Sequence, residues 1–301
     1  MITSWIVLGL GRCGLQLARS MRAAGVPIAG LVGRSRSSRL RAGRALPGVV
    51  VASRVGRFLE PAGLVLAVPD AVITEVAASL TEALPAAVEV VLHTSGLATA
   101  AALTPLARPG RRLGSLHPLV PFPTAAGPRV DLAGVTAAVE GDPRAVAAAV
   151  VLAHRLGMRP RRLSSGQKAR YHAAAAVAAS LTHALLVAAR AELVQAGFSP
   201  AAARRALAPL VSAATGAALT ARGWERLTGP LVRGDAATIR AHLATLDRQL
   251  GRVYRAVSAL ALAGLASDGS ISPATARRAA EALTDRCFRV SVRTMAPRGG
   301  R

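Results

Sequence analysis

Three kinds of residue are scarce in this chain of 301 residues, and each scarcity narrows the classes of protein it can belong to. Aromatic residues make up 3% of it, which leaves few rings on which nucleic-acid bases could stack. Lysine occurs once, as Lys168. The two cysteines, Cys13 and Cys287, have no neighbouring cysteine and no metal-like histidine spacing, so we expect free thiols in a reducing, cytoplasmic compartment.

The excess of basic over acidic residues needs an explanation of its own. Lys+Arg number 38 and Asp+Glu number 15, a net charge of +23 that by itself suggests nucleic-acid binding. Arginine in place of lysine, together with abundant alanine, glycine and proline, is however typical of GC-rich coding. We therefore expect no specific nucleic-acid partner, and a steep salt dependence of duplex binding would indicate otherwise.

Two apolar stretches raise the question of export or membrane insertion. The run 5–10 has neither a basic segment before it nor a small-residue cleavage site, so we expect no secretion signal. The uncharged stretch 173–189 approaches the length of a membrane span, but it is mostly alanine and contains Ser180, Thr182 and His183. We interpret it as a buried core helix and expect no membrane association.

The first half of the chain alternates strand-like and helical patterns. Short apolar runs rich in β-branched residues or leucine lie at 5–8, 28–32, 49–51, 64–68, 88–92, 112–116 and 135–139. Strands separated by helices predict a doubly wound parallel sheet of the Rossmann type. We assign residues 1–160 to this NAD(P)-binding domain.

The second half has no strand pattern after about residue 164. Alanine-rich segments follow, with helix starts at Ser199-Pro200 and Ser272-Pro273. We therefore assign residues 161–301 to an all-helical domain that binds substrate and forms a dimer. Its helices are too apolar to face solvent, so they must pack on each other, on the first domain or on a second subunit, and a homodimer is our expectation.

A glycine-rich loop follows the first predicted strand, with the sequence Gly9-Leu10-Gly11-Arg12-Cys13-Gly14. In this spacing the first glycine makes a tight turn, the second lets the backbone approach a pyrophosphate, and the third lets the helix pack on the strand. The amides at the helix start face the anion. We expect all six residues to contact a dinucleotide.

The end of the second predicted strand bears on the choice of dinucleotide. An NAD enzyme places a carboxylate there for the ribose hydroxyls, whereas this chain has Gly33-Arg34-Ser35. Arg34 and Ser35 suit a 2′-phosphate, so NADP is favoured and NAD is less expected; a solvated helix start is the alternative. Val68 and Pro69, where the fourth strand ends, are further expected cofactor contacts, although Pro69 and Asp70 equally suit a plain helix cap.

Polar residues also follow the fifth and sixth predicted strands. His93, Ser95 and His117 lie where open α/β sheets bind ligands, so we expect Ser95 at the cofactor, His93 at the substrate and His117 in catalysis. Each histidine could equally cap a helix or be a satisfied buried polar group.

Lys168, Tyr171 and His172 are spaced to share one helix face. A lone lysine in an arginine-rich chain points to a task that a guanidinium cannot perform, such as giving up a proton, although a surface lysine at a helix start is the alternative. We predict Lys168 and His172 as catalytic and Tyr171 as a substrate contact. No Ser-His-Asp order, Walker loop, paired-carboxylate site or metal cluster is convincing, so we predict no metal.

Taken together, these segments resemble a family of bacterial proteins that join a Rossmann-like domain to a helical domain of unknown function, number 2520. The resemblance rests on the glycine loop and on several further motifs across almost the whole chain: His93-Thr94-Ser95-Gly96, Gly114-Ser115-Leu116-His117-Pro118-Leu119, Tyr171-His172-Ala173-Ala174-Ala175, Leu227-Thr228-Gly229-Pro230, Arg233-Gly234-Asp235 and His242-Leu243.

The family is similar to pyrroline-5-carboxylate reductase, prephenate dehydrogenase and ketopantoate reductase. This resemblance implies a second domain of the 6-phosphogluconate-dehydrogenase C-terminal type that completes the active site. It also implies that Arg233 contacts a substrate carboxylate and that Ser180, where the family usually has asparagine, contacts the substrate; Asp235 could equally be an N-cap.

Two functional hypotheses follow. The first is an NADP-dependent oxidoreductase for a small carboxylate-bearing carbonyl, hydroxy or imino compound, with Lys168 or His172 supplying the proton. The second is a non-catalytic NADP-binding sensor or scaffold, since a fold does not fix a function.

Overall fold

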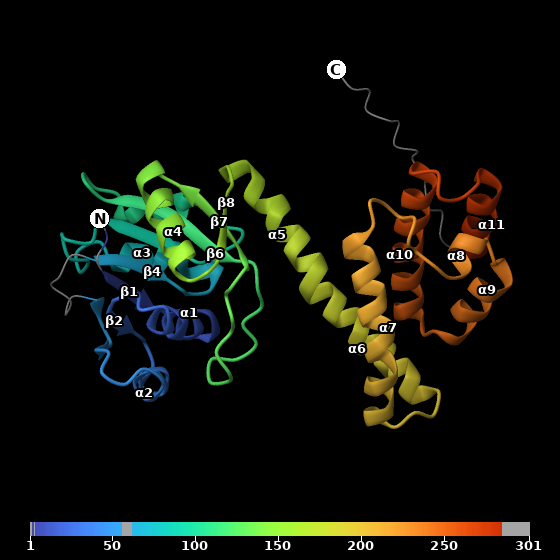
Figure 1. Ribbon diagram of the computed structural model, residues 1–301, viewed down its shortest axis with the longest axis horizontal. Coiled ribbons are helices and arrows are strands. Elements are labelled where there is room, and N and C mark those ends of the chain that lie inside the picture. The colour runs from blue at the N-terminus through green and yellow to red at the C-terminus, as the bar shows by residue number, and fades with distance from the viewer. Residues whose placement is uncertain (1, 3, 56–61, 285–301) are drawn as a thin grey trace, which may run out of the picture. The chain divides into compact units, whose positions relative to one another are not determined.

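The computed structural model describes residues 2, 4–55 and 62–284, and Cys287 lies outside them. The chain forms two compact units, Met1–Leu181 and Thr182–Arg301 (Figure 1). The division falls later than the predicted boundary after residue 160. The difference arises because the helix that begins at Lys168 starts against the sheet of the first unit.

The first unit is built on an eight-stranded sheet with strand order β3-β2-β1-β4-β5-β6-β7-β8. Its strands are β1 Ser4–Leu8, β2 Ile28–Val32, β3 Val51–Ala52, β4 Ala62–Leu66, β5 Val90–His93, β6 Arg112–Pro118, β7 Thr136–Gly141 and β8 Arg159–Arg162. The order reverses between β1 and β4, and the strands from β3 to β6 are parallel. The predicted Rossmann-type sheet is confirmed.

The far edge of the sheet differs from the prediction. β7 pairs antiparallel with β6, because the connection 119–135 contains no helix that could carry the chain back for a parallel crossover. β8 pairs parallel with β7 and was not expected, since its sequence Arg-Pro-Arg-Arg lacks an apolar run and it is the exposed edge strand.

Alternate residues of the strands enter two separate cores, as in a doubly wound fold. Val7 and Leu92 face a core built with α1 Arg12–Ala23, α2 Arg36–Ala45 and α4 Pro143–Arg155. Ile6 and Val91 face the opposite core, built with α3 Ile73–Ser79 and the 3-10 helix η3 Ala100–Leu106. Each fully buried leucine or isoleucine contributes about 1.5–3 kcal/mol, so these cores hold the carboxyl ends of the strands in fixed positions.

A long helical segment leads from the first unit into the second. It comprises η4 Ser165–Gln167, α5 Lys168–Ala176, a π-helical turn Val177–Leu181 and α6 Thr182–Gln195. The stretch predicted as a buried core helix is not buried within the chain, and α6 has no buried residue. By length and composition alone, the helix Ser165–Gln195 could cross a membrane, a test that helices of soluble proteins also pass.

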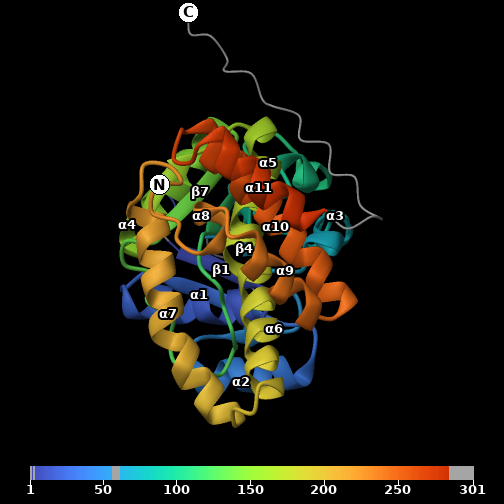
Figure 2. The same cartoon turned by 90° about the vertical axis from the view of Figure 1, so that its right-hand side faces the viewer.

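The second unit consists of helices throughout the part that the structure describes. They are α6, α7 Pro200–Thr220, α8 Pro230–Arg233, α9 Ala236–Thr245, α10 Arg248–Ser267 and α11 Pro273–Leu283. α6 and α7 form an antiparallel pair (Figure 1; Figure 2). Ile239, Leu262, Leu265 and Leu283 form the core of α9, α10 and α11.

Candidate active site

The glycine loop has the geometry that its spacing predicts. Gly9 leaves β1 with φ of +99°, and a side chain there would collide with the carbonyl of Ala67. A Cβ on Gly14 would overlap the carbonyl oxygen of Gly9, so α1 packs against β1 through this glycine. Gly11 is the N-cap of α1, and a Cβ there would have no atom within 4 Å. The backbone is therefore tightly packed at Gly9 and Gly14, whereas space for a ligand remains beside Gly11.

A groove of about 820 Å³ runs along the carboxyl ends of β1, β2 and β4. It is formed by the glycine loop, by the turn after β2, by 53–55 after β3, by the turn after β4 and by α3. Among the predicted cofactor contacts, it brings together Gly9, Leu10, Gly11, Arg34, Ser35, Val68 and Pro69. Arg12 lies in the first turn of α1.

One end of the groove is basic and rich in hydroxyl groups. Arg34, Arg41 and Arg54 line it together with Ser35 and Ser38, and no described residue of its lining is acidic. The Nε of Arg41 is buried without a hydrogen-bond partner among the described residues. Ser35 is also the N-cap of α2, where its Oγ accepts from the amide of Ser38 at 3.2 Å. This end suits a phosphate group, because it offers unpaired donors and positive charge.

The turn after β5 holds a chain of buried polar contacts. The amide of Ser95 donates to Nδ1 of His93 at 3.1 Å, so Nε2 of His93 carries the proton and donates to the carbonyl of Thr99 at 3.0 Å. His93 is completely buried, and burial lowers its pKa to about 4. Both ring nitrogens are therefore used within the chain, which favours a structural role over the predicted substrate contact.

Ser95 connects this turn to the turn after β4. Its Oγ donates to Asp70 Oδ2 at 2.6 Å and accepts from the amides of Leu97 and Ala98. Because these contacts occupy its hydroxyl, Ser95 shapes the turn, and it is not among the groove residues.

Cys13 makes a corresponding link from the glycine loop. Its thiol forms a side-chain hydrogen bond with Thr94, while burial raises its pKa to about 11. Cys13 is thus an un-ionised thiol that joins the start of α1 to the turn after β5.

Lys168 lies at the start of α5 with 1% of its surface exposed. Its Nζ donates to the carbonyl of Ser95 at 3.1 Å and to Oγ of Ser115 at 2.7 Å, and it lies 3.8 Å from Oε2 of Glu140. Burial lowers the pKa of Lys168 to about 8, against the opposing effect of Glu140 and Asp70. The ammonium fixes α5 to β5, β6 and β7 by contacts that leave it no exposed face.

Glu140, which sequence reasoning missed, is the carboxylate that holds this cluster together. Besides Lys168, it accepts from the amide of Ala100 at 2.9 Å, from Ser115 at 3.2 Å and from Ser165 at 2.8 Å. The signal available in the sequence was a glutamate directly after the apolar run 135–139, because a carboxylate at the end of a buried strand needs partners.

A second cluster, more open than the first, comprises His117, Tyr171 and His172. Nδ1 of His117 and the hydroxyl of Tyr171 are 2.9 Å apart, and the rings of His117 and His172 meet edge to face with centroids 6.0 Å apart. Nδ1 of His172 is buried without a partner among the described residues. Of the three residues predicted to share a helix face, Tyr171 and His172 meet His117 of β6, whereas Lys168 is bound to Ser95, Ser115 and Glu140.

Gly96 leaves room for this cluster. A Cβ on Gly96 would lie 2.5 Å from Nδ1 of His172 and 3.0 Å from Nε2 of His117. The turn after β5 therefore approaches both rings more closely than any side chain permits.

The charge state of the open cluster follows from burial. Burial, followed by the neighbouring His172 and Lys168, lowers the pKa of His117 to about 4, so its ring is neutral at pH 7. Burial raises the pKa of Tyr171 to about 12, so the phenol keeps its proton. His117 is therefore a neutral hydrogen-bond partner of the Tyr171 hydroxyl, and the phenol retains a proton that it can donate in a hydrogen bond.

Two predicted substrate contacts lie elsewhere in the chain. Ser180 is exposed within the π-helical turn Val177–Leu181, an element often found at functional sites. Arg233 is exposed at the end of α8 in the second unit. Asp235 is the N-cap of α9, where its carboxylate accepts from the amide of Thr238 at 3.1 Å.

A Rossmann-like domain model matches residues 3–118, and the model of a domain of unknown function, DUF2520, matches residues 135–261. The chain joins a Rossmann-like domain to a DUF2520 domain. The predicted family is confirmed. The comparison with curated proteins gives no match.

The DUF2520 match spans both structural units. It includes Glu140, Lys168, Tyr171 and His172, whereas His117 belongs to the Rossmann-like match. The two clusters are thus assembled from both domains, and the first residues of the DUF2520 domain complete the sheet.

Solved structures show the same fold at low sequence identity. A candidate NADP oxidoreductase from Bacteroides fragilis has a TM-score of 0.72 at 19% identity, covering 85% of this chain and 96% of its own. A protein from Thermotoga maritima has a TM-score of 0.58 at 21% identity, covering 92% and 98%. Prephenate dehydrogenase from A. aeolicus, in complex with hydroxyphenyl propionate and NAD+, has a TM-score of 0.52 at 15% identity, covering 65% and 70%. The chain therefore has the Rossmann-like fold of NAD(P)-dependent oxidoreductases.

Proposed function

We propose that this protein is an NADP-dependent oxidoreductase that acts on a small carboxylate-bearing carbonyl, hydroxy or imino compound. The observation that carries the proposal is that the groove and the cluster of His117, Tyr171 and His172 lie next to each other at the carboxyl ends of the strands. Asp70, in the turn that continues the groove lining after Pro69, hydrogen-bonds to Ser95, and the next residue, Gly96, lies against His117 and His172. Bound NADPH would supply the hydride in such a site.

The groove supports NADP over NAD. Gly9, Gly11 and the start of α1 would hold the pyrophosphate, because the open side of Gly11 lets backbone amides approach an anion. Arg34, Arg41 and Ser35 would hold the 2′-phosphate, and the buried unpaired Nε of Arg41 favours an anion there. No described lining residue supplies the carboxylate that ribose hydroxyls would need.

We assign proton transfer to the open cluster. Lys168 and His172 were the two candidates from the sequence, and the burial of Lys168 among protein partners favours a positioning role for it. His172 has an unused Nδ1, and Tyr171 has a phenol bonded to His117. We propose that His172 or Tyr171 donates the proton while His117 orients the donor.

For the substrate carboxylate, Arg233 remains our proposed partner, with Ser180 as a further contact. Arg233 is exposed at the end of α8, and its guanidinium can bind a carboxylate through two parallel hydrogen bonds. We also propose a cytoplasmic homodimer, in keeping with the free Cys13 and the exposed apolar helices of the second unit.

A non-catalytic NADP-binding protein is the alternative. The complete use of His93, Ser95 and Lys168 in internal hydrogen bonds favours it, because these groups then serve the fold. It shares the cofactor groove with the oxidoreductase and differs in turnover.

The test is NADPH oxidation, followed by its absorbance, with a panel of small oxo acids and cyclic imino acids. For any substrate that the wild type turns over, Tyr171→Phe and His172→Asn should together lower kcat at least about 100-fold with little change in NADPH affinity. His183→Asn, on the exposed surface of α6, is the matched control and should leave kcat unchanged. Unchanged kcat in both site variants would refute the proton-transfer assignment; NADPH binding without turnover of any substrate would favour the alternative.

A further inference from the structure

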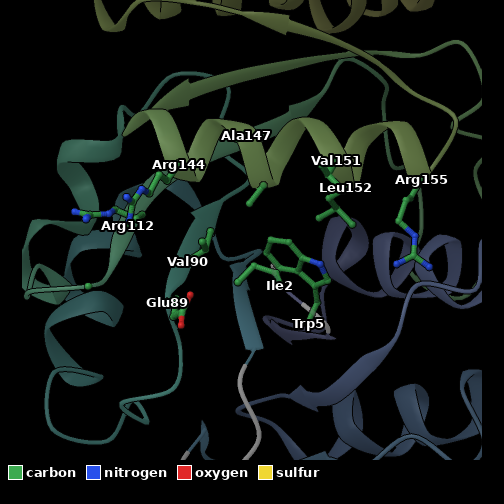
Figure 3. Close-up of a pocket in the computed structure, with 12 residues that line it drawn as sticks. Ile2, Trp5, Glu89, Val90, Arg112, Arg144, Ala147, Val151, Leu152 and Arg155 are labelled. Atoms are coloured by element: carbon green, nitrogen blue, oxygen red, sulfur yellow. The ribbon is translucent and has the colours of Figure 1, made fainter.

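A second cavity lies at the amino ends of the parallel strands, opposite the carboxyl ends that line the groove. It has a volume of about 290 Å³ and lies between α4 and the first residues of β1, β5 and β6 (Figure 3). All of its lining belongs to the first unit. The proposed cofactor groove is at the carboxyl ends of β1, β2 and β4, so the two spaces lie at opposite ends of the parallel strands.

The floor of this cavity is apolar. The indole of Trp5 and the side chain of Val90 rise from the sheet, and Leu152 and Ala147 face them from α4 (Figure 3). Trp5 is 5% exposed, so its ring forms part of a packed wall with one accessible side. Such a surface suits the body of an aryl or alkyl group.

Two arginines stand together at one end of the cavity, Arg112 from β6 and Arg144 from α4 (Figure 3). Arg112 has one long ion pair, 4.0 Å from Asp142, and its Nε is buried without a partner among the described residues. Asp142 meanwhile serves as the N-cap of α4, accepting from the amide of Arg144 at 2.9 Å. Among the described residues, most guanidinium donors at this end therefore have no protein partner, and an anion can bind without breaking a strong contact.

The remaining charges define the ligand further. Arg155, at the other end of α4, already donates to the carbonyl of Gly25 at 2.7 Å, so it is less available. Glu89 precedes β5, and its carbonyl accepts from the amide of Arg112 at 2.7 Å, but its carboxylate forms no ion pair with either arginine in the described structure. One anionic group beside an apolar body matches this distribution better than a ligand charged at both ends.

We propose that this cavity is a binding site for a small carboxylate with an aryl or alkyl body, separate from the site of the proposed oxidoreductase. The carboxylate lies between Arg112 and Arg144, and the apolar body covers Trp5 and Val90. Neither the Rossmann-like fold nor the proposed reaction needs this site, so it is a place for a ligand other than the cofactor and substrate.

The fluorescence of Trp5, which lines the cavity, can report ligand binding. In a Trp224→Phe background, Trp5 is the single tryptophan of the chain. Titration with 3-phenylpropionate should change its fluorescence saturably, and 3-phenylpropanamide, which lacks the charge, should bind at least about tenfold more weakly. Saturating NADPH should leave the affinity for 3-phenylpropionate unchanged, because the two sites lie at opposite ends of the parallel strands.

Substitutions can test the two arginine charges and the volume of the cavity separately. Arg112→Gln and Arg144→Gln should each weaken binding about tenfold, and Ala147→Phe should abolish it by filling the cavity while all charges remain. Arg204→Gln, on the exposed face of α7, is the matched control. Arg144 and Ala147 are exposed, so these two variants should retain the thermal stability of the parent.

Equal binding of the amide, insensitivity to both arginine variants, absence of a saturable signal, or displacement by NADPH would each overturn the proposed site. None of these outcomes bears on NADPH oxidation, so the proposed function is tested separately.

Discussion

A methyl group added to the glycine loop should have opposite consequences at Gly11 and at Gly14. At Gly11 it meets open space, so Gly11→Ala should preserve stability and weaken NADPH binding at least about tenfold by keeping the pyrophosphate from the backbone. At Gly14 it overlaps the carbonyl of Gly9, so Gly14→Ala should lower the melting temperature. Thermal unfolding and NADPH titration measure the two effects.

Gly43→Ala is the control for these variants, because Gly43 lies inside α2 with open space around its Cβ. Gly43→Ala should leave the affinity for NADPH unchanged and should not lower the melting temperature. If Gly11→Ala bound NADPH as the wild type does, the loop would not hold a pyrophosphate in the proposed manner.

Lys168 should make stability depend on alkaline pH. Its pKa is about 8 in the folded chain and 10.5 ordinarily. Below pH 8, Lys168 is protonated in both the folded and the unfolded chain. Between pH 8 and pH 10.5 it is protonated in the unfolded chain and neutral in the folded chain, so its contribution to the unfolding free energy rises with pH. It should rise by about 3 kcal/mol and be complete above pH 10.5.

The measurement is the difference in unfolding free energy between the wild type and Lys168→Met, obtained by denaturant titration at several pH values. The difference should increase across the stated range, whereas the corresponding difference for Arg170→Gln, an exposed neighbour, should stay flat. A constant difference for Lys168→Met would show that the buried ammonium has an ordinary pKa.

At the scale of elements, the Glu140 cluster joins β7 to β6, η3 and the start of α5. Glu140→Gln leaves the ammonium of Lys168 buried opposite a neutral group, which should cost about 3–5 kcal/mol of unfolding free energy. Adding Lys168→Met should recover part of that loss, giving a coupling energy of about 1 kcal/mol or more in the double-mutant cycle.

Glu75→Gln, on the exposed surface of α3, is the matched control and should lie within about 0.5 kcal/mol of the wild type. Strict additivity of the two cluster substitutions would mean that Glu140 and Lys168 do not stabilise one another.

Local sequence patterns were sufficient for the elements that repeat a simple period. The strands that end in the glycine loop and in His93 are short apolar runs, and their order follows from alternation with helices. The strand β7 was predicted at 135–139, but its antiparallel direction was missed because an apolar strand has no direction in its sequence. The edge strand β8 was missed because three of its four residues are arginine, which periodicity assigns to solvent.

The residues of the candidate site likewise fall into those that local spacing could find and those that it could not. Its residues that follow strands, such as His117, or share a helix face, such as Tyr171 and His172, could be found by spacing. Glu140 and Asp70 could not, because their partners lie 25 or more residues away and only the sheet order brings them together. The burial of Lys168, which changes its proposed role, likewise depends on tertiary packing.

At the scale of the whole molecule, large apolar side chains are exposed on the long helices of the second unit. Leu210 is 65% exposed and Leu219 is 87% exposed, both on α7. Because this much apolar surface needs a cover, we expect a homodimer formed through these helices. Light scattering should give about twice the 30.7 kDa mass of the chain.

Leu210→Asp combined with Leu219→Asp should shift the protein towards the monomer. Leu40→Asp, at a leucine 53% exposed on α2 of the first unit, should leave the dimer intact. A wild-type protein that stays monomeric at micromolar concentration would contradict the dimer.

The central claim is that the groove along β1, β2 and β4 holds NADP, and parallel titrations of NADPH and NADH test it most directly. The wild type should bind NADPH at least about tenfold more tightly than NADH, because the 2′-phosphate meets Arg34 and Arg41. In the double variant Arg34→Ala with Arg41→Ala this preference should disappear while NADH affinity is kept. Equal binding of the two nucleotides by the wild type, or binding of neither, would contradict the account.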